Sequence, residues 1–254
     1  MEDALLEIPS IETNITTRCT NCCVGCNHLI QLLPDFILDP KDLYEQCKAL
    51  SKIVKPKKFT VTGGDCFLHP DILGIFKAIR ESGLTQVIQV DTNLNLLSQQ
   101  DEEVWKSINR IRFTVYPKVL NYGEMLEKAH KYGIEVDAVQ YANKFHKPFT
   151  YKKMSEADTK KNFNACIYRR DCNFIHDWKF YRCPGMSVIR PKLGDGKCDG
   201  IDFKNITEYQ LKIYLDQAVP FESCYQCIHC FSPDVKWSQW EECQKSDWFK
   251  RSGQ

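Results

Sequence analysis

The sequence lacks the run of about 18 uncharged apolar residues that a membrane-spanning helix needs. It starts with the acidic Met1-Glu2-Asp3 and has no early apolar segment of the kind found in secretory signals. It also lacks an excess of either charge, because 34 Lys and Arg residues balance 33 Asp and Glu residues. We therefore expect a soluble, cytoplasmic protein with no membrane partner, and an extended nucleic-acid surface is disfavoured.

Internal repeats and low-complexity tracts are also missing, so nothing indicates a solenoid or a disordered tail. No second histidine stands at metal-ligand spacing from His28, His69, His176 or His229, and polar packing is the expectation for all four. With 254 residues, 43% of them hydrophobic, the chain can form one large domain or a domain with an appendage.

Cysteine, by contrast, is abundant, with 14 residues. Such a count in a chain without a secretory signal indicates metal or redox chemistry rather than disulfides. Eight of the 14 fall in the last third of the chain, which is more than packing explains. These eight are Cys166, Cys172, Cys183, Cys198, Cys224, Cys227, Cys230 and Cys243.

The most informative stretch is the loop with Cys19, Cys23 and Cys26, which follows a predicted strand ending at Thr17. Three thiolates on one loop can hold three corners of a 4Fe–4S cluster and leave the fourth iron open. Zinc is the alternative ligand, because Cys-rich loops also suit it. Cys22 adds a second metal spacing with Cys19, but only the set with Cys23 fits the whole pattern.

One helical segment later, Phe59 to Thr62 reads as a buried strand that runs into Gly63-Gly64-Asp65. Together, the cysteine spacing and this turn resemble the radical S-adenosylmethionine (radical SAM) enzymes. In that family SAM chelates the open iron, and an electron from the cluster cleaves SAM to a 5′-deoxyadenosyl radical that abstracts hydrogen from a substrate.

The resemblance implies SAM-contacting residues. Gly63, Gly64 and Asp65 match the Gly-Gly-Glu motif that receives the methionyl amino group, with an acid one methylene shorter. Thr92-Asn93-Leu94 is similar to the family's Thr-Asn-Gly turn, with leucine in place of glycine. Gly25 stands where relatives often carry an aromatic residue near the adenine.

Five predicted strands alternate with helices, which is the pattern of a parallel sheet with right-handed crossovers. They cover residues 5–17, 59–62, 86–91, 110–116 and 134–141. The fold class is α/β, and the resemblance implies a partial, open (β/α) TIM-like barrel over residues 1–145. Barrel enzymes place functional residues at the carboxyl ends of strands, here Asp65, Asn93, Thr114, Gln140 and Tyr141. A purely structural role is the alternative for Asp65 and for the other four.

Residues 147–164 read as a linker or surface lobe, and residues 146–254 are expected to form a small α+β lobe. The order of elements in this lobe resembles the twitch extension, a short form of the SPASM domain. It consists of one cysteine, a hairpin over residues 177–182, a second cysteine, a helix and a Cys-x2-Cys pair. The resemblance implies a second 4Fe–4S cluster on Cys166, Cys183, Cys224 and Cys227, with Cys230 or Cys172 as a substitute ligand. Zinc is again the alternative.

The resemblance therefore implies a radical SAM oxidoreductase that uses SAM, two 4Fe–4S clusters and a flavodoxin or ferredoxin-type electron donor. Family members of similar size and layout act on cyclitols, so we expect a small sugar or cyclitol-type alcohol as substrate.

Three alternatives stay open. A radical epimerase would return hydrogen from a spare thiol, for which Cys172, Cys198, Cys230 and Cys243 are candidates. A peptide- or nucleotide-modifying enzyme would use the same clusters. Peptide-modifying members often carry an upstream leader-binding domain, and only about ten residues precede the β-branched run that begins at Ile11. A non-catalytic zinc-binding protein is the third alternative.

Overall fold

The computed structural model describes residues 5–117, 119, 121–146, 148–150, 152–166, 168–230 and 234–236. Its main feature is an eight-stranded sheet with the strand order β11-β10-β9-β2-β4-β5-β6-β7. Strands β2, β4, β5, β6 and β7 run parallel to their neighbours. Their bounds are Ile11–Asn14, Phe59–Thr62, Ile88–Thr92, Arg110–Val115 and Glu135–Tyr141. None of the helices in the described residues is long and apolar enough to span a bilayer.

Side chains alternate across the strands of this sheet. On β6, Ile111, Phe113 and Val115 are buried, while Arg112 and Thr114 remain partly exposed. The buried side chains join the main hydrophobic core with residues of the surrounding helices. The polar side chains therefore face the opposite, inner side of the sheet.

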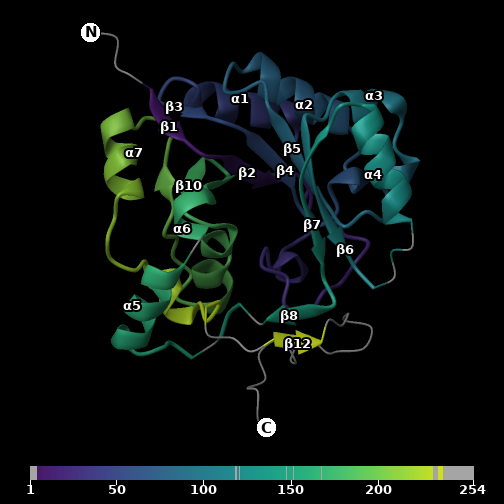
Figure 1. Cartoon of the computed structure of the whole chain (residues 1–254). Coiled ribbons are helices and arrows are strands. Elements are labelled where there is room, and N and C mark those ends of the chain that lie inside the picture. Colours follow the sequence, from purple (N-terminus) through teal and green to yellow (C-terminus); the bar gives the residue numbers. More distant parts are fainter. Residues whose placement is uncertain are drawn as a thin grey trace.

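Helices α1 to α4 connect the parallel strands (Figure 1). Helix α1 begins where Asp39 accepts a hydrogen bond from the Lys41 amide, and Pro40 occupies its first turn. The Asp71 side chain caps α2 by accepting from the Gly74 amide. The bounds are Pro40–Leu50 for α1, Ile72–Glu81 for α2, Glu102–Lys106 for α3 and Tyr122–Lys131 for α4.

Two sequence-based boundaries are wrong. The first predicted strand is two strands, β1 (Leu6–Ile8) and β2, because the chain breaks at Pro9 and Ser10. Leu43, Cys47, Leu50 and Val54 recur at helical spacing, which predicts one helix through Val54. In the structure α1 ends at Leu50, and Val54 begins β3 (Val54–Pro56), which pairs in parallel with β1. A buried apolar residue at position 54 fits both the spacing of a helix and the alternation of a strand. The pattern of apolar residues alone therefore assigns Val54 to the wrong element.

The sheet continues past residue 145, where we predicted the domain boundary. Strand β9 (Phe174–His176) pairs in parallel with β2, and β10 (Lys179–Tyr181) and β11 (Ile201–Asp202) follow in antiparallel pairs. The β9–β10 turn has positive φ at Asp177 (45°) and Trp178 (61°). Among the described strands, β7 and β11 are the two edges, and the sheet is open between them.

The segment 147–164, predicted to be a linker or surface lobe, contains helix α5 (Glu156–Ala165). Ser155 caps this helix, and its buried side chains are Thr159, Asn162 and Phe163. With a single apolar member, that face gives no hydrophobic periodicity to detect.

The other regular elements are shorter. Figure 1 shows α5, α6 and α7 beside β10, away from α3 and α4, with β8 and β12 paired at the lower edge. Helices α6 and α7 span Tyr168–Asp171 and Glu208–Leu215, and strands β8 and β12 span Lys144–His146 and Asp234–Lys236. Short helical turns η1 to η6 span Ile30–Leu32, Cys66–Leu68, Leu97–Gln99, Pro184–Ser187, Ile189–Leu193 and Glu222–Gln226.

Candidate active site

A cavity of about 590 Å³ lies at the carboxyl ends of the parallel strands. Thr62, Thr92, Thr114 and Gln140 bring the ends of β4, β5, β6 and β7 to its wall, and the loop after β2 closes one side. Because the carboxyl ends of parallel strands meet at one edge, residues far apart in the sequence converge here.

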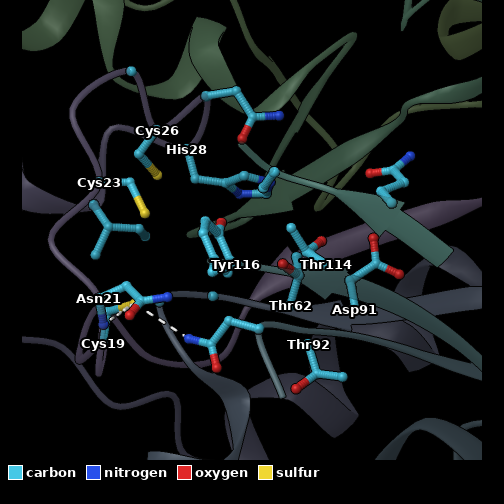
Figure 2. Close-up of a pocket in the computed structure, with 18 of the residues that line it drawn as sticks. Cys19, Asn21, Cys23, Cys26, His28, Thr62, Asp91, Thr92, Thr114 and Tyr116 are labelled. Atoms are coloured by element: carbon cyan, nitrogen blue, oxygen red, sulfur yellow. Dashed lines mark hydrogen bonds between the residues drawn. The ribbon is translucent and has the colours of Figure 1, made fainter. Parts of the chain in front are cut away.

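The cysteine loop forms one wall of the cavity. Cys19, Cys23 and Cys26 all line it, whereas Cys22 is exposed and does not (Figure 2). Burial raises the pKa of the Cys19 and Cys26 thiols; backbone amides of Ile30, His28 and Leu29 lower that of Cys26. Three sulfurs that face one cavity are the donor set that a 4Fe–4S cluster uses when one iron stays open.

The two glycines after β4 allow close contact with this loop. A Cβ on Gly64 would lie 2.2 Å from the Arg18 carbonyl oxygen, and one on Gly63 would lie 2.6 Å from that of Thr16. Their closeness permits two backbone hydrogen bonds, from the Gly64 amide to Thr16 (2.9 Å) and from the Asp65 amide to Arg18 (2.8 Å). Any larger residue would push the turn away from the loop.

Asp65 is buried beside the cavity and is not one of its lining residues. Its carboxylate accepts hydrogen bonds from the Thr20 hydroxyl (2.9 Å) and from the Phe67 amide (3.2 Å), so it also caps η2. Burial raises the pKa of Asp65, while the Thr20 and Phe67 hydrogen bonds lower it. The predicted contact with the methionyl amino group stays a prediction.

Asn93 lines the cavity and is tied to the cysteine loop. Its amide donates to Thr20 Oγ1 (3.0 Å) and lies 3.8 Å from Cys19 Sγ. Asn95 donates to Thr20 Oγ1 (2.9 Å) and to Asn21 Oδ1 (3.1 Å). Thr20, Asn21 and Asn95 are not among the site residues predicted from the sequence. Thr20 and Asn21 lie beside the cysteines and Asn95 follows β5, and these positions could have identified them as site residues.

Leu94 stands where the Thr-Asn-Gly turn of the radical SAM family has glycine, and the structure shows how the turn accommodates it. Its φ is 72°, in the left-handed region that favours glycine, and its side chain is fully buried. The Leu94 amide donates to Thr92 Oγ1 at 3.0 Å. The turn is therefore kept with leucine, and packing of the side chain offsets the strain.

Thr114, Gln140 and Tyr141, near the carboxyl ends of β6 and β7, line the cavity, and the predicted contact of Thr114 and Tyr141 with SAM stays a prediction. Tyr141 is 61% exposed, and its hydroxyl donates to the Tyr122 hydroxyl at 2.9 Å. Tyr116, which the sequence analysis did not select, also lines the cavity and interacts with Cys23. Burial raises its pKa well above the usual value, so the phenol stays protonated.

Charged groups occupy the end of the cavity away from the cysteines. Figure 2 shows Asp91 across from the cysteine loop, with Tyr116 and Thr114 between them in this view. Arg112 bridges Asp91 (3.1 Å) and Asp137 (2.7 Å). Asp91 and Arg112 line the cavity, and together they offer both hydrogen-bond donors and acceptors to a ligand.

Glu12, on β2, interacts electrostatically with this pair, although β4 lies between β2 and the strand of Asp91. Burial raises its pKa to about 8, as does the charge of Asp91, while Arg112 and Lys58 lower it. Within the described part of the chain it forms no side-chain hydrogen bond or ion pair. Glu12 is thus a carboxyl group held largely protonated at neutral pH.

The histidines have local partners, as expected for polar packing. His28 Nδ1 lies 2.7 Å from Asn14 Oδ1, and burial lowers its pKa to about 4. His69 Nε2 lies 2.8 Å from the Leu38 carbonyl oxygen. His28 also lines the cavity as a neutral side chain.

The spare thiols separate into different environments. Cys172 lines the same cavity as the cysteine loop. Cys198 is half-buried elsewhere, with its sulfur 3.1 Å from the Tyr181 hydroxyl, and Cys230 is exposed, with its amide bonded to Asn162. Cys243 lies outside the described residues.

Cys166, Cys183, Cys224 and Cys227 gather in the second part of the chain. Burial raises the pKa of Cys183, and so do the nearby thiols of Cys227, Cys224 and Cys166. No three His, Cys, Asp or Glu side chains within the described ranges converge closely enough to share one metal ion. The second cluster on these four cysteines stays a prediction.

Comparison with solved structures gives a fold-level match. The structure of BtrN in complex with AdoMet (SAM) and 2-DOIA superposes with a TM-score of 0.50 at 10% identity, over 88% of this chain and 85% of that chain. Native anSMEcpe with bound AdoMet and Cp18Cys peptide gives a TM-score of 0.40 at 13% identity, over 74% of this chain and 54% of that chain. Streptococcus suis SuiB bound to S-adenosylmethionine gives 0.44 at 12% identity, over 85% and 67%.

The last two scores are under 0.5, which is too low to carry an argument. No protein-family model matches the chain, and no curated protein sequence does. The chain thus has the fold of BtrN, a radical SAM enzyme. The resemblance inferred from the sequence is confirmed at the level of that fold.

Proposed function

We propose that this chain is a radical SAM enzyme that acts on a small polyhydroxylated substrate, most simply by oxidising an alcohol carbon to a carbonyl. The observation that carries the proposal is the meeting of Cys19, Cys23 and Cys26 with the Gly63-Gly64 turn at one wall of the main cavity. A 4Fe–4S cluster bound there would supply the electron that cleaves SAM and so starts the radical chemistry.

Different residues along the cavity would bind the cluster and SAM. Cys19, Cys23 and Cys26 would hold three irons. Gly63, Gly64, Asp65, Asn93, Thr114 and Tyr141 would surround SAM. The hydrogen bonds that join Asn93 and Asp65 to Thr20 hold both side chains in position relative to the cysteine loop.

The opposite end of the cavity supports a polar substrate. Asp91, Arg112 and Gln140 present a carboxylate, a guanidinium and an amide to the same space. Hydroxyl groups both donate and accept hydrogen bonds, so a polyol fits this wall better than an apolar ligand. The fold is also that of BtrN, whose structure holds AdoMet and 2-DOIA.

Cys166, Cys183, Cys224 and Cys227 would hold a second 4Fe–4S cluster, which would accept the electron that substrate oxidation releases. A reduced flavodoxin or ferredoxin-type protein would supply the electron for SAM cleavage. Four thiolates leave no open iron, so this cluster would transfer electrons and bind no substrate.

Cys172 favours a second candidate function, a radical epimerase. Its thiol faces the main cavity, and burial raises its pKa, so the sulfur keeps its hydrogen at neutral pH. In that reaction the S–H bond breaks, a C–H bond forms on the substrate radical, and a thiyl radical remains. One electron from the same donor protein and one proton from water restore the thiol.

Iron analysis tests the class of enzyme. Protein reconstituted without oxygen should be brown and carry about eight irons per chain. Replacing Cys19, Cys23 and Cys26 by alanine should remove about half of the iron, whereas Cys22→Ala, at an exposed thiol, should remove none. Stoichiometric zinc without visible absorption would refute the proposal.

Deuterated water distinguishes the two reactions. Oxidation predicts a product two mass units lighter than the substrate, with no deuterium at the attacked carbon. Epimerisation predicts an unchanged oxidation state and one solvent deuterium at that carbon, which Cys172→Ser should abolish. Deuterium incorporation that survives Cys172→Ser would exclude this thiol as the donor.

A further inference from the structure

A second cavity, of about 350 Å³, lies in the C-terminal half of the chain. It shares no lining residue with the main cavity. Phe163 of α5, Phe221 before η6 and Leu215 of α7 give it apolar walls. Arg169 of α6 and Arg182 after β10 also line it, and they are its two cationic side chains.

These arginines lack the carboxylate partners that half-buried guanidinium groups normally have. Among the residues that the structure describes, neither Arg169 nor Arg182 has an acidic oxygen at ion-pair distance. Arg169 lies over the Phe163 ring, with its guanidinium carbon 4.6 Å from the ring centroid. Burial lowers the pKa of Arg182, and so does the charge of Arg169, while Tyr214, Cys183 and Asp216 raise it.

The one acidic residue in the wall is already neutralised. Asp216 forms an ion pair with Lys212, one helical turn before it. Asp216 also attracts Arg182, but the wall still holds two guanidinium groups that repel each other and a single carboxylate, which is paired with Lys212. Such an arrangement costs free energy unless a ligand supplies the negative charge.

We propose that Arg169 and Arg182 form a binding site for a phosphate group, carried by a small molecule or free in solution. A phosphate monoester has a charge of about −1.5 to −2 near neutral pH, which balances two guanidinium groups. Each guanidinium offers paired N–H donors that match phosphate oxygens. Arg182 adjoins Cys183, which would hold the second cluster, but the phosphate would contact the two arginines and neither SAM nor a cluster.

The test is a titration of the reconstituted protein with inorganic phosphate, followed by calorimetry at constant ionic strength in chloride buffer. Saturable binding of one phosphate per chain is expected. Arg182→Gln and Arg169→Gln should each weaken it by about tenfold or more, because each removes charge-assisted hydrogen bonds. Lys160→Gln is the matched control; it removes one positive charge from the exposed face of α5, outside the cavity.

Melting in phosphate-free buffer shows whether Arg182 has a merely structural role. Since its guanidinium is half-buried and forms no ion pair with any described residue, Arg182→Gln should melt no lower than the parent protein. A lower melting temperature, absence of saturable binding, or equal weakening by Lys160→Gln would overturn the proposal. Acetate that binds as tightly as phosphate would overturn the assignment of the ligand as a phosphate group.

Discussion

The Thr20 hydroxyl donates a 2.9 Å hydrogen bond to Asp65 Oδ2 and so joins the cysteine loop to the Gly-Gly-Asp turn. Asn93 and Asn95 both donate to the same Thr20 oxygen, at 3.0 and 2.9 Å. One threonine thus connects three loops that follow β2, β4 and β5. A disturbance at Asp65 should be transmitted to the cysteine loop through this residue.

Asp65→Ala should weaken SAM binding by about tenfold or more while the iron content stays unchanged, because a buried carboxylate that accepts charge-assisted hydrogen bonds is lost. Equilibrium dialysis of SAM against the reconstituted protein measures this. Thr20→Val keeps the carboxylate and removes only its hydroxyl donor. If Thr20→Val retains affinity, Asp65 acts on SAM directly; unchanged affinity in Asp65→Ala would make Asp65 purely structural.

Glu12 predicts a dependence of stability on pH. Its pKa is about 8 in the folded protein against 4.5 for the free group, so between these pH values the folded state holds a proton that the unfolded state has lost. The free energy of unfolding should therefore fall as pH rises from 4.5 to 8, by at most roughly 1.4 kcal/mol per pH unit from this residue.

Glu12→Gln removes the titration and keeps the side chain's shape. Urea unfolding at pH 5.5 and pH 8.5 should show a smaller loss of stability in the variant than in the parent protein. Other groups titrate equally in both proteins, so the difference isolates Glu12. An identical pH dependence in the two proteins would mean that Glu12 is ionised in the fold.

The β9–β10 turn predicts opposite effects at two adjacent residues. Trp178 has a positive φ, but its ring packs against Phe203, with centroids 5.6 Å apart, and its amide donates to Gln46. Trp178→Gly should relieve about 1 kcal/mol of strain and lose more than that in packing, so the melting temperature falls. Asp177 is exposed, and Asp177→Gly should raise the melting temperature slightly.

A melting temperature that rises in Trp178→Gly would show that strain outweighs packing at this turn. Thermal melts of the two variants beside the parent protein provide the measurement.

The order of strands and helices and the strand-end residues were predictable because each signal is local. Gly63-Gly64 marked the end of the strand over residues 59–62, and alternating apolar residues marked Arg110 to Val115 as a strand. The Thr20 network was not predictable, because it consists of side chains brought together from three loops. Helix α5 was missed because burial of Thr159 and Asn162 leaves no apolar periodicity.

The second cysteine group illustrates the same limit. Spacing selects candidate ligands but does not say which thiol faces which space. The fold brings Cys172 to the main cavity and puts Cys198 beside Tyr181, although both lie in the same cysteine-rich segment. The roles assigned to Cys166, Cys183, Cys224 and Cys227 stay predictions.

The most direct test of the central claim is the formation of 5′-deoxyadenosine from SAM by the anaerobically reconstituted protein with a strong reductant. We predict that chromatography detects 5′-deoxyadenosine with the parent protein and with Cys22→Ala, and none when Cys19, Cys23 and Cys26 are replaced by alanine. Absence of 5′-deoxyadenosine from parent protein that carries its full iron content, or its persistence after the triple replacement, would contradict the account.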